Sequence, residues 1–517
     1  MIDVRHLSIP HVLQLHGIAT PSAAAAISSR GRLTWRELMD RANRIANGLR
    51  GLGLKSGDRV VLLFDNSQEL LELIVGTIVS GGVVVPLSGL MTQEVVCRMT
   101  RASGAGFVFA QGRFLARFAS DDLAEIGAER RFATQEHEGW TDYESWLARQ
   151  SAQVPALDYP PDASISILYT SGTTGTPKGM EHSHFARLLY PLVLGPLLGI
   201  GRDSVTVLST PMYHNGTWTT MLPTLYSGGT VVIDEAFSAH GFQETVSRQQ
   251  CTHVFMVPTQ LILLAADSGF DAAKLGSLRT IMISGAPLPG DMLESLRAKL
   301  EHVDLCEIYG MGEGFMTFSS ARKGKGSVAG SVGRPIAEAD TDIQIIDDSD
   351  RIVEPGIIGE IAGTSSFMLK GYFGDPEATR KAVWIHPNGR AYLRSGDLGR
   401  FDENGFLYLA GRKKDMIISG GVKVYATDIE GIFMSHPDVL EVAAIAIPHE
   451  KWGETPLLLA VMKPSARISE EGLREWGNRQ LGKTQRVDRV EFRSSFPRNS
   501  LDKILKRELR EPYWKAG

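Results

Sequence analysis

Apolar runs of strand length alternate with amphipathic helical patterns along the first part of the chain. Residues 34–51 predict a helix that opens with a capping box formed by Thr34 and Glu37. Its expected buried face consists of Leu38, Ala42, Ile45 and Leu49. The runs 58–63 and 83–86 are interpreted as strands, with a second helix between them. This alternation predicts an α/β layered domain.

The middle third of the chain continues this pattern and adds loops of small residues. Further buried strands are expected at residues 165–168, 204–209, 229–233, 253–257, 280–284 and 306–309. A helix is expected to carry on one face His214, Thr217, Trp218 and Met221. Loops rich in Gly, Ser, Thr and Pro follow several of the strands. Because ligands bind beyond the carboxyl ends of strands in open α/β sheets, we expect the functional site there.

The last third has shorter strands. From about residue 330, Asn–Gly turn signals at 388–389 and 404–405 predict a β-rich subdomain. Beyond it, a helix capped by Thr427 and Glu430, two strands, a further helix and a basic tail predict a small α+β unit.

The predicted fold class is therefore α/β with two domains. Residues 1–413 are expected to form a large N-terminal domain of layered α/β subdomains plus the β-rich subdomain. Residues 414–517 are expected to form a small, mobile α+β C-terminal domain, with the boundary near Lys414.

Composition excludes several classes of protein. The chain has 517 residues, of which 43% are hydrophobic and 22% charged, as in a globular protein with a substantial core. A net charge of -5 and a pI near 6.3 give no electrostatic signature of a nucleic-acid partner. The three cysteines, Cys97, Cys251 and Cys306, are too scattered to suggest a disulfide framework or a metal knuckle.

The most apolar stretch, residues 71–91, is long enough for a membrane span. It is broken by Gly81, Gly82 and Pro86, so a helix followed by a strand is the better interpretation. The first residues include Asp3 and Arg5 and no apolar core, so we expect no signal peptide. We expect a cytoplasmic protein without a transmembrane segment, and its oligomeric state stays open, with a homodimer as one alternative.

The loop from Tyr169 to Gly179, Tyr-Thr-Ser-Gly-Thr-Thr-Gly-Thr-Pro-Lys-Gly, has the chemistry of a phosphate-binding loop. Glycines allow backbone N–H groups to surround an anion, hydroxyls add donors, and Lys178 supplies a point charge. The loop differs from the common P-loop pattern because Pro177 precedes the lysine and Gly179 follows it. The alternative for such a Ser/Thr/Gly-rich segment is a flexible surface loop.

Five motifs in order resemble the adenylate-forming superfamily, and within it the acyl-CoA synthetases, over nearly the whole chain. They are residues 169–179, Pro211-Met-Tyr-His214, Tyr309-Gly-Met-Gly-Glu313, Ser395-Gly-Asp397 through Arg412-Lys-Lys-Asp415, and Pro497-Arg498 with Lys503. The resemblance implies two half-reactions. A carboxylate attacks the α-phosphorus of ATP and releases pyrophosphate, and a thiol then displaces AMP.

The resemblance also implies roles for individual residues. The catalytic residues that it implies are Lys503, Glu313 and His214, and Glu313 is also the expected ligand of Mg²⁺. The phosphates of ATP are expected at Thr170, Ser171, Gly172, Thr173, Thr174 and Lys178. The rest of the site for ATP and CoA is expected at Gly285, Ala286, Pro287, Tyr309, Gly310, Asp397, Arg412, Gly420 and Gly421. In the family, Tyr309 stacks on adenine, Asp397 binds the ribose hydroxyls, and Lys414 is the hinge.

The sequence departs from the family pattern at four positions. Gly312 stands where Thr is usual, and Asp502 where Gly is usual. Lys423 and Ala426 replace the common Asn and Pro after the two glycines of the C-terminal loop. One lost donor to the α-phosphate costs about 1–3 kcal/mol unless another group replaces it.

The family's acid pocket lies between the helix at His214 and the strands that end near Ser284 and Tyr309. Its expected apolar lining is Trp218, Met221, Met311 and Phe315, with Gly285 and Gly312 leaving depth. We therefore expect an apolar monocarboxylic acid, aliphatic or aromatic, rather than a dicarboxylic acid. Two alternatives stay open, an adenylating enzyme that loads a carrier-protein thiol and a non-catalytic nucleotide-binding relative.

Overall fold

The computed structural model describes residues 7–118, 123, 125–169, 177–286, 288, 290–320, 327–336, 340–464, 466–498 and 503–514. The chain divides into two compact units. Unit 1 consists of Met1–Gly326, Ile336–Thr341 and Ser365–Lys381, and unit 2 consists of Ser327–Pro335, Asp342–Thr364 and Ala382–Gly517. The expected boundary at Lys414 falls inside unit 2 and stays a prediction.

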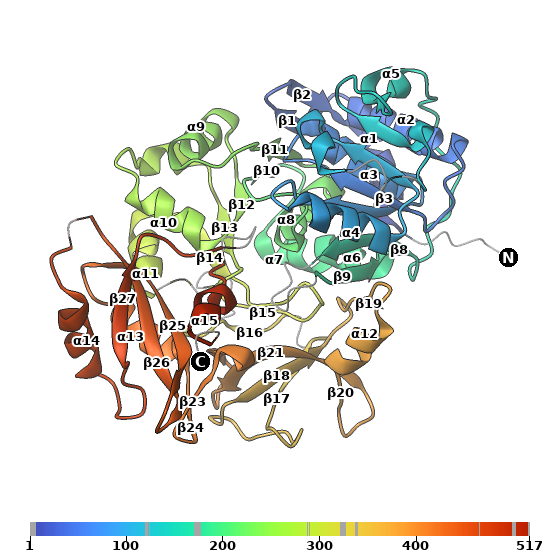
Figure 1. Cartoon of the computed structure of the whole chain (residues 1–517). Coiled ribbons are helices and arrows are strands. Elements are labelled where there is room, and N and C mark those ends of the chain that lie inside the picture. Colours follow the sequence, from blue (N-terminus) through green and yellow to red (C-terminus); the bar gives the residue numbers. More distant parts are fainter. Residues whose placement is uncertain are drawn as a thin grey trace. The chain divides into compact units, whose positions relative to one another are not determined.

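Unit 1 contains two sheets whose strands are mostly parallel (Figure 1). The seven-stranded sheet has the order β14 (Asp304–Glu307), β13 (Thr280–Ile283), β12 (His253–Met256), β10 (Val205–Leu208), β11 (Thr230–Ile233), β1 (Ala24–Ser28) and β2 (Gly31–Thr34). The eight-stranded sheet has the order β19 (Gly371–Tyr372), β9 (Gly179–Ser183), β8 (Ser164–Tyr169), β4 (Val83–Leu87), β3 (Arg59–Leu63), β5 (Phe107–Ala110), β6 (Arg131–Ala133) and β7 (Thr141–Asp142). All five residues of β4 are buried, as expected for a parallel strand covered on both faces.

Most helices of unit 1 alternate with strands along the chain. They are α1 (Ile9–Ala19), α2 (Trp35–Gly51), α3 (Gln68–Val79), α4 (Gln93–Ser103), α5 (Tyr143–Ala148), α6 (His184–Leu189), α7 (Gly195–Leu198), α8 (Asn215–Tyr226), α9 (Ala239–Gln249), α10 (Pro258–Ala266), α11 (Gly290–Lys299) and α12 (Pro376–Ala382). The capping box of α2 is confirmed, because Thr34 Oγ1 accepts from Glu37 N at 3.3 Å and Glu37 Oε2 accepts from Thr34 N at 2.8 Å. Its predicted apolar face is fully buried.

The predicted site segments follow the carboxyl ends of parallel strands. Residues 209–214 follow β10, residues 284–286 follow β13, and residues 308–313 follow β14. One detail of this region was predicted incorrectly. His214 is the residue that precedes α8, with extended backbone (φ -97°, ψ 140°), so it lies outside the helix that carries Thr217, Trp218 and Met221.

Unit 2 contains two five-stranded sheets. The first consists of β17 (Asp342–Ile346), β18 (Gly359–Thr364), β20 (Val383–Ile385), β21 (Ala391–Phe401) and β22 (Leu407–Arg412). The second consists of β23 (Ile417–Ser419), β24 (Val422–Val424), β25 (Val439–His449), β26 (Gly453–Met462) and β27 (Arg489–Arg493). Its helices are α13 (Ala426–Met434), α14 (Glu470–Asn478) and α15 (Lys506–Trp514).

The capping box expected at Thr427 and Glu430 is wrong. Helix α13 begins at Ala426, one residue before Thr427, and no side chain caps it. The Thr427 hydroxyl instead donates to the carbonyl oxygen of Ala410 at 2.9 Å. A tertiary hydrogen bond therefore takes the hydroxyl that the local pattern assigned to the helix terminus.

The predicted fold class is confirmed, since a large mixed α/β N-terminal part precedes a small α+β C-terminal part. The apolar stretch at residues 71–91 contains most of α3 and all of β4, which confirms the helix-then-strand interpretation. Within the described ranges, no helix has the length and apolar character needed to cross a membrane.

Candidate functional site

The predicted metal carboxylate, Glu313, lies in a turn that folds back on itself after β14. The backbone N–H of Thr317 donates to the Tyr309 carbonyl oxygen at 2.7 Å, and Gly310 pairs with Met316 across an antiparallel bridge. The turn leaves Tyr309 partly exposed and Gly310 exposed, whereas Glu313 is only 9% exposed. The Leu369 N–H donates to the Glu313 carbonyl oxygen at 2.8 Å, so the backbone of this residue is held as well.

Tyr372 connects Glu313 to Lys178. Its hydroxyl donates to Glu313 Oε1 at 2.8 Å. The Lys178 ammonium lies 4.7 Å from the centre of the Tyr372 ring, within reach of a cation–π interaction. Burial and the neighbouring Glu313 carboxylate raise the pKa of Tyr372 above its ordinary value, so the phenol keeps its proton and remains a donor. The structure thus brings together two residues predicted from motifs far apart in sequence.

Removing only the hydroxyl of Tyr372 tests this connection. Tyr372→Phe keeps the ring beside Lys178 but leaves Glu313 without this donor. Because a hydrogen bond to a charged group contributes about 1.5–3 kcal/mol, we expect the rate of acid-dependent ATP–pyrophosphate exchange to fall about 10-fold or more. The matched control is Tyr408→Phe, whose hydroxyl contacts Asp402 in unit 2 and is expected to leave the rate unchanged. Equal rates for Tyr372→Phe and the wild type would contradict the role of this hydroxyl.

Other predicted residues of unit 1 have structural explanations of their own. Gly285 follows β13 with φ +101°, a backbone conformation that favours glycine. Ala286 beside it is exposed. His214 is 7% exposed, and its ring lies 4.5 Å from that of Tyr213. The predicted ligands Thr170, Ser171, Gly172, Thr173, Thr174 and Pro287 lie outside the described residues.

In unit 2, Asp397 and Arg412 lie side by side. They are register partners on β21 and β22, and Arg412 Nε contacts Asp397 Oδ1 at 2.8 Å. The Asp397 side chain is 14% exposed and that of Arg412 is 41% exposed. The Ser395 hydroxyl holds the backbone just before Asp397. It donates to the Ile361 carbonyl oxygen at 2.7 Å and accepts from the Asp397 N–H at 2.9 Å.

Gly420 and Gly421 form the two-residue turn between β23 and β24. Their φ angles are +58° and +81°, which is the positive-φ pair that a type I′ hairpin requires. A Cβ on Gly420 would lie 2.7 Å from Cε3 of Trp452, so the turn also needs glycine for space. The pair is therefore explained by the hairpin alone, and its role in thioester formation stays a prediction.

Lys503 lies in the segment just before α15. Its neighbour Ile504 pairs with Arg498 across an antiparallel bridge and packs with the apolar cluster of β25 and β26. Lys503 itself is half-buried. Lys506, three residues later, forms a 2.6 Å ion pair with Glu430. Asp502, one of the departures from the family pattern, lies outside the described residues.

Comparison with known proteins places these features in one family. The model of the AMP-binding enzyme family matches residues 15–373, and the model of the AMP-binding enzyme C-terminal domain matches residues 428–503. The chain belongs to the AMP-binding enzyme family.

Relatives of this AMP-binding enzyme match nearly its full length. A long-chain-fatty-acid–CoA ligase of Mycobacterium tuberculosis is 31% identical over 98% of both chains, and a feruloyl-CoA synthase of an Amycolatopsis species is 30% identical over 96% of both. The ATP-bound crystal structure of MatB from Rhodopseudomonas palustris matches with a TM-score of 0.88 at 28% identity, over 98% of this chain and 99% of that one. These matches confirm the predicted superfamily and the prediction of an AMP-forming acid–CoA ligase.

One buried cation of the enzyme was not predicted. Arg187 on α6 has no exposed surface, and its guanidinium lies 5.0 Å from the ring centres of both Tyr190 and Trp218. The sequence around it, Phe-Ala-Arg-Leu-Leu, has the pattern of an ordinary amphipathic helix and gives no sign of this burial. Trp218 and Met221, expected to line the acid pocket, are fully buried in the main core.

The space beside Gly312 is also filled. A Cβ on Gly312 would lie 2.6 Å from the sulfur of Met180. The neighbouring atoms are the tip of the flexible Met180 side chain, so the depth that Gly312 is expected to leave for the acid stays a prediction.

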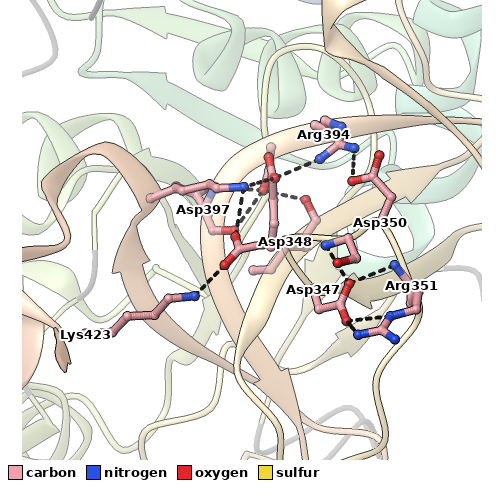
Figure 2. A network of polar contacts seen from close by, with 12 residues as sticks. Asp347, Asp348, Asp350, Arg351, Arg394, Asp397 and Lys423 are labelled. Carbon is pink, nitrogen blue, oxygen red and sulfur yellow. Dashed lines mark hydrogen bonds and ion pairs between the residues drawn. The ribbon is translucent and has the colours of Figure 1, made fainter. Parts of the chain in front are cut away.

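Figure 2 shows a network of polar contacts in unit 2 that includes Asp348, Arg394 and Lys423. Lys423 forms a 2.6 Å ion pair with Asp348, and Lys413, beside Lys414, contacts Glu360 at 2.9 Å. Burial lowers the pKa of Lys414 itself. The Lys423 departure therefore adds a pair between exposed side chains, and such pairs contribute about 0–1 kcal/mol. The ion pair with Asp348 explains Lys423 without assigning it a catalytic role.

Proposed function

We propose that the enzyme activates an apolar monocarboxylic acid, fatty or aromatic, with ATP and transfers the acyl group to CoA. In the first half-reaction, a carboxylate oxygen attacks the α-phosphorus and the bond to pyrophosphate breaks. In the second, the CoA sulfur attacks the acyl carbon and AMP leaves. Catalysis rests on positioning and on neutralising charge, since no covalent enzyme intermediate is needed.

The observation that carries the proposal is the cluster of Lys178, Tyr372 and Glu313. A lysine ammonium and a carboxylate held by a half-buried phenol lie together at the end of the loop predicted to bind phosphate. Mg²⁺ is usually bound through one or two carboxylates plus phosphate oxygens and water, and the Glu313 carboxylate fits that donor set. When bound, the ion would neutralise charge on the phosphates, while Tyr372 fixes the carboxylate and Lys178 contributes a second positive charge.

The residues of unit 2 complete the proposal. The Asp397 carboxylate, which Arg412 contacts at 2.8 Å, is the group that we assign to the two hydroxyls of the ribose. Lys503 supplies the charge that meets the reacting carboxylate and α-phosphate. We propose that the C-terminal domain closes for adenylation and moves again for thiol attack, with Lys414 as the hinge.

The class of acid is supported by the relatives. Their names include a long-chain-fatty-acid–CoA ligase and a feruloyl-CoA synthase, and we propose an acid of the fatty or aromatic class for this enzyme. A second candidate is loading of a carrier-protein thiol, because a fatty acid–[acyl-carrier-protein] ligase of Streptomyces coeruleorubidus is 29% identical over 96% of this chain. A cytoplasmic location and the oligomeric state stay predictions from the sequence.

A panel of acids tests the proposal. Fatty acids of graded length, aromatic acids and dicarboxylic acids are each incubated with ATP, Mg²⁺ and CoA, and AMP release is measured. We expect AMP with apolar monocarboxylic acids and little with dicarboxylic acids. Pyrophosphate exchange without AMP release on free CoA would favour the carrier-protein candidate, and binding of ATP with no exchange for any acid would contradict an enzymatic role.

A further inference from the structure

Arg187 is a fully buried cation whose observed partners are all neutral. Its Nε donates to Ser166 Oγ at 3.2 Å and its Nη1 donates to Asn215 Oδ1 at 2.5 Å. Its Nη2 lies 3.2 Å from Nδ1 of His182. Burying a charge without a carboxylate partner costs folding free energy. We therefore expect a functional reason for the buried guanidinium in this cluster.

The partners of Arg187 come from different segments of unit 1. Ser166 and His182 are cross-strand partners on β8 and β9, and Asn215 is the first residue of α8. Asn215 Oδ1 also accepts from the Tyr190 hydroxyl at 3.2 Å. The guanidinium therefore joins the strand before the phosphate loop, the strand after it, and the helix that follows His214.

The chemistry of arginine determines the tautomer of His182. A guanidinium only donates hydrogen bonds, so Nδ1 of His182 accepts from Arg187. Burial, and then the charge of Arg187, lower the pKa of His182 well below its ordinary value, so the ring is neutral and carries one proton. That proton is on Nε2, which lies 2.8 Å from the Gly312 carbonyl oxygen and donates to it.

This hydrogen-bond chain ends one residue before Glu313. Gly312 has no side chain of its own to hold the turn, and Met180 fills the adjoining space. The His182 imidazole therefore anchors the Gly312 carbonyl from one side, while Leu369 anchors the Glu313 carbonyl from the other. Together they fix the backbone on both sides of the Glu313 Cα atom.

We propose that Arg187 and His182 are positioning residues, in which Arg187 sets the tautomer of His182 and His182 holds the Gly312 carbonyl so that Glu313 points at the nucleotide. The inference rests on the proposed role of Glu313 in adenylation. Glycine at position 312 has no side chain that could restrain the turn, and the buried imidazole of His182 restrains its carbonyl instead.

Two substitutions at His182 separate positioning from packing. In His182→Gln, the amide oxygen accepts from Arg187 and the amide nitrogen donates to Gly312, so the chain of hydrogen bonds survives. In His182→Leu, a residue of similar volume makes neither bond. We expect His182→Leu to lower kcat of acid-dependent ATP–pyrophosphate exchange about 10-fold, with KM for the acid within about twofold of wild type. His182→Gln should recover to within about threefold of wild type.

The matched control is His184→Leu. His184 is also a buried histidine, two residues further on, but its ring lies beside Tyr159 and outside the hydrogen-bond chain. Its substitution should leave kcat within about twofold of wild type, because no residue of the chain loses a partner. Equal kcat values for His182→Leu and His182→Gln would overturn the proposal, as would equal losses at His182 and His184.

The tautomer is tested directly by NMR of protein labelled with ¹⁵N-histidine, with the His182 signals assigned from their loss in His182→Gln. We expect the proton on Nε2 in the wild type. Arg187→Met, which removes the donor, should shift His182 toward the Nδ1–H form. A wild-type ring protonated on Nδ1 overturns the inference even if Arg187→Met does not fold. Absence of exchange with every acid in the wild type would instead contradict the proposed function, and the tautomer would still test the hydrogen-bond chain.

Discussion

Glu313→Gln is expected to lower the rate of acid-dependent ATP–pyrophosphate exchange by about 10²–10³-fold, the loss typical of a preorganised electrostatic group at a reacting centre. The substitution keeps the size of the side chain, and the Gln carbonyl oxygen can still accept from the Tyr372 hydroxyl. The substitution removes the negative charge of the carboxylate that we propose binds Mg²⁺. The Mg²⁺ concentration needed for half-maximal exchange should therefore rise as well.

Glu307→Gln is the matched control for this prediction. Glu307 ends β14 in the same sequence neighbourhood, and burial raises the pKa of its carboxyl. It has no assigned contact with the nucleotide, so its exchange rate should stay within about threefold of wild type. Similar losses at Glu307 and Glu313 would show that the effect comes from the stability of this segment. Full activity of Glu313→Gln would remove Glu313 from the metal site.

Lys503→Ala is expected to separate the two half-reactions. The charge that meets the reacting carboxylate and α-phosphate is lost, so we expect adenylation to fall about 10²–10³-fold. Transfer of the acyl group from supplied acyl-adenylate to CoA should stay within a few-fold of wild type, because AMP is already the leaving group. The two rates are measured separately, by pyrophosphate exchange and by CoA-thioester formation from synthetic acyl-adenylate.

Lys506→Ala serves as the control for Lys503. Its ammonium forms a 2.6 Å ion pair with Glu430, and we assign it no role in the substrate chemistry. Adenylation by this variant should be close to wild type. Equal effects of Lys503→Ala on both half-reactions would contradict a role confined to adenylation, and an unchanged adenylation rate would remove Lys503 from the catalytic residues.

Local patterns in the sequence were sufficient where the interactions are local. The capping box at Thr34 needs only a residue three positions away, and the strand β4 needs only its own apolar run. Thr427 shows the limit of the same reasoning. The pattern Thr-x-x-Glu is present, but helix α13 begins one residue earlier and the hydroxyl bonds Ala410, seventeen residues away in sequence. A local sequence pattern therefore fails to predict a helix cap when a group distant in sequence forms a hydrogen bond with the same side chain.

The functional site was predictable as a set of motifs and not as a set of contacts. Lys178 and Glu313 were found because each lies in a short, distinctive segment. Tyr372 was missed, since it lies 59 residues from Glu313 and its surroundings carry no motif. The Arg187–His182–Gly312 chain was missed for the same reason, because its last hydrogen bond spans 130 residues. Such groups are found only when the fold brings them together.

The acid pocket was the least predictable part. Glycine at position 312 is expected to leave space, and the tip of Met180, 132 residues away in sequence, adjoins that space. Trp218 and Met221 were expected to face the acid, and both are completely buried in the core. Apolar residues at helical spacing indicate a buried face without indicating what covers it.

The most direct test of the proposed function is product analysis by mass spectrometry for one active acid, with and without CoA. With acid, ATP and Mg²⁺ alone, we expect acyl-adenylate and pyrophosphate; on addition of CoA, we expect acyl-CoA and AMP in equal amounts. Formation of ADP and phosphate, or acyl-CoA without an acyl-adenylate that CoA consumes, would contradict the two-step reaction assigned to this enzyme.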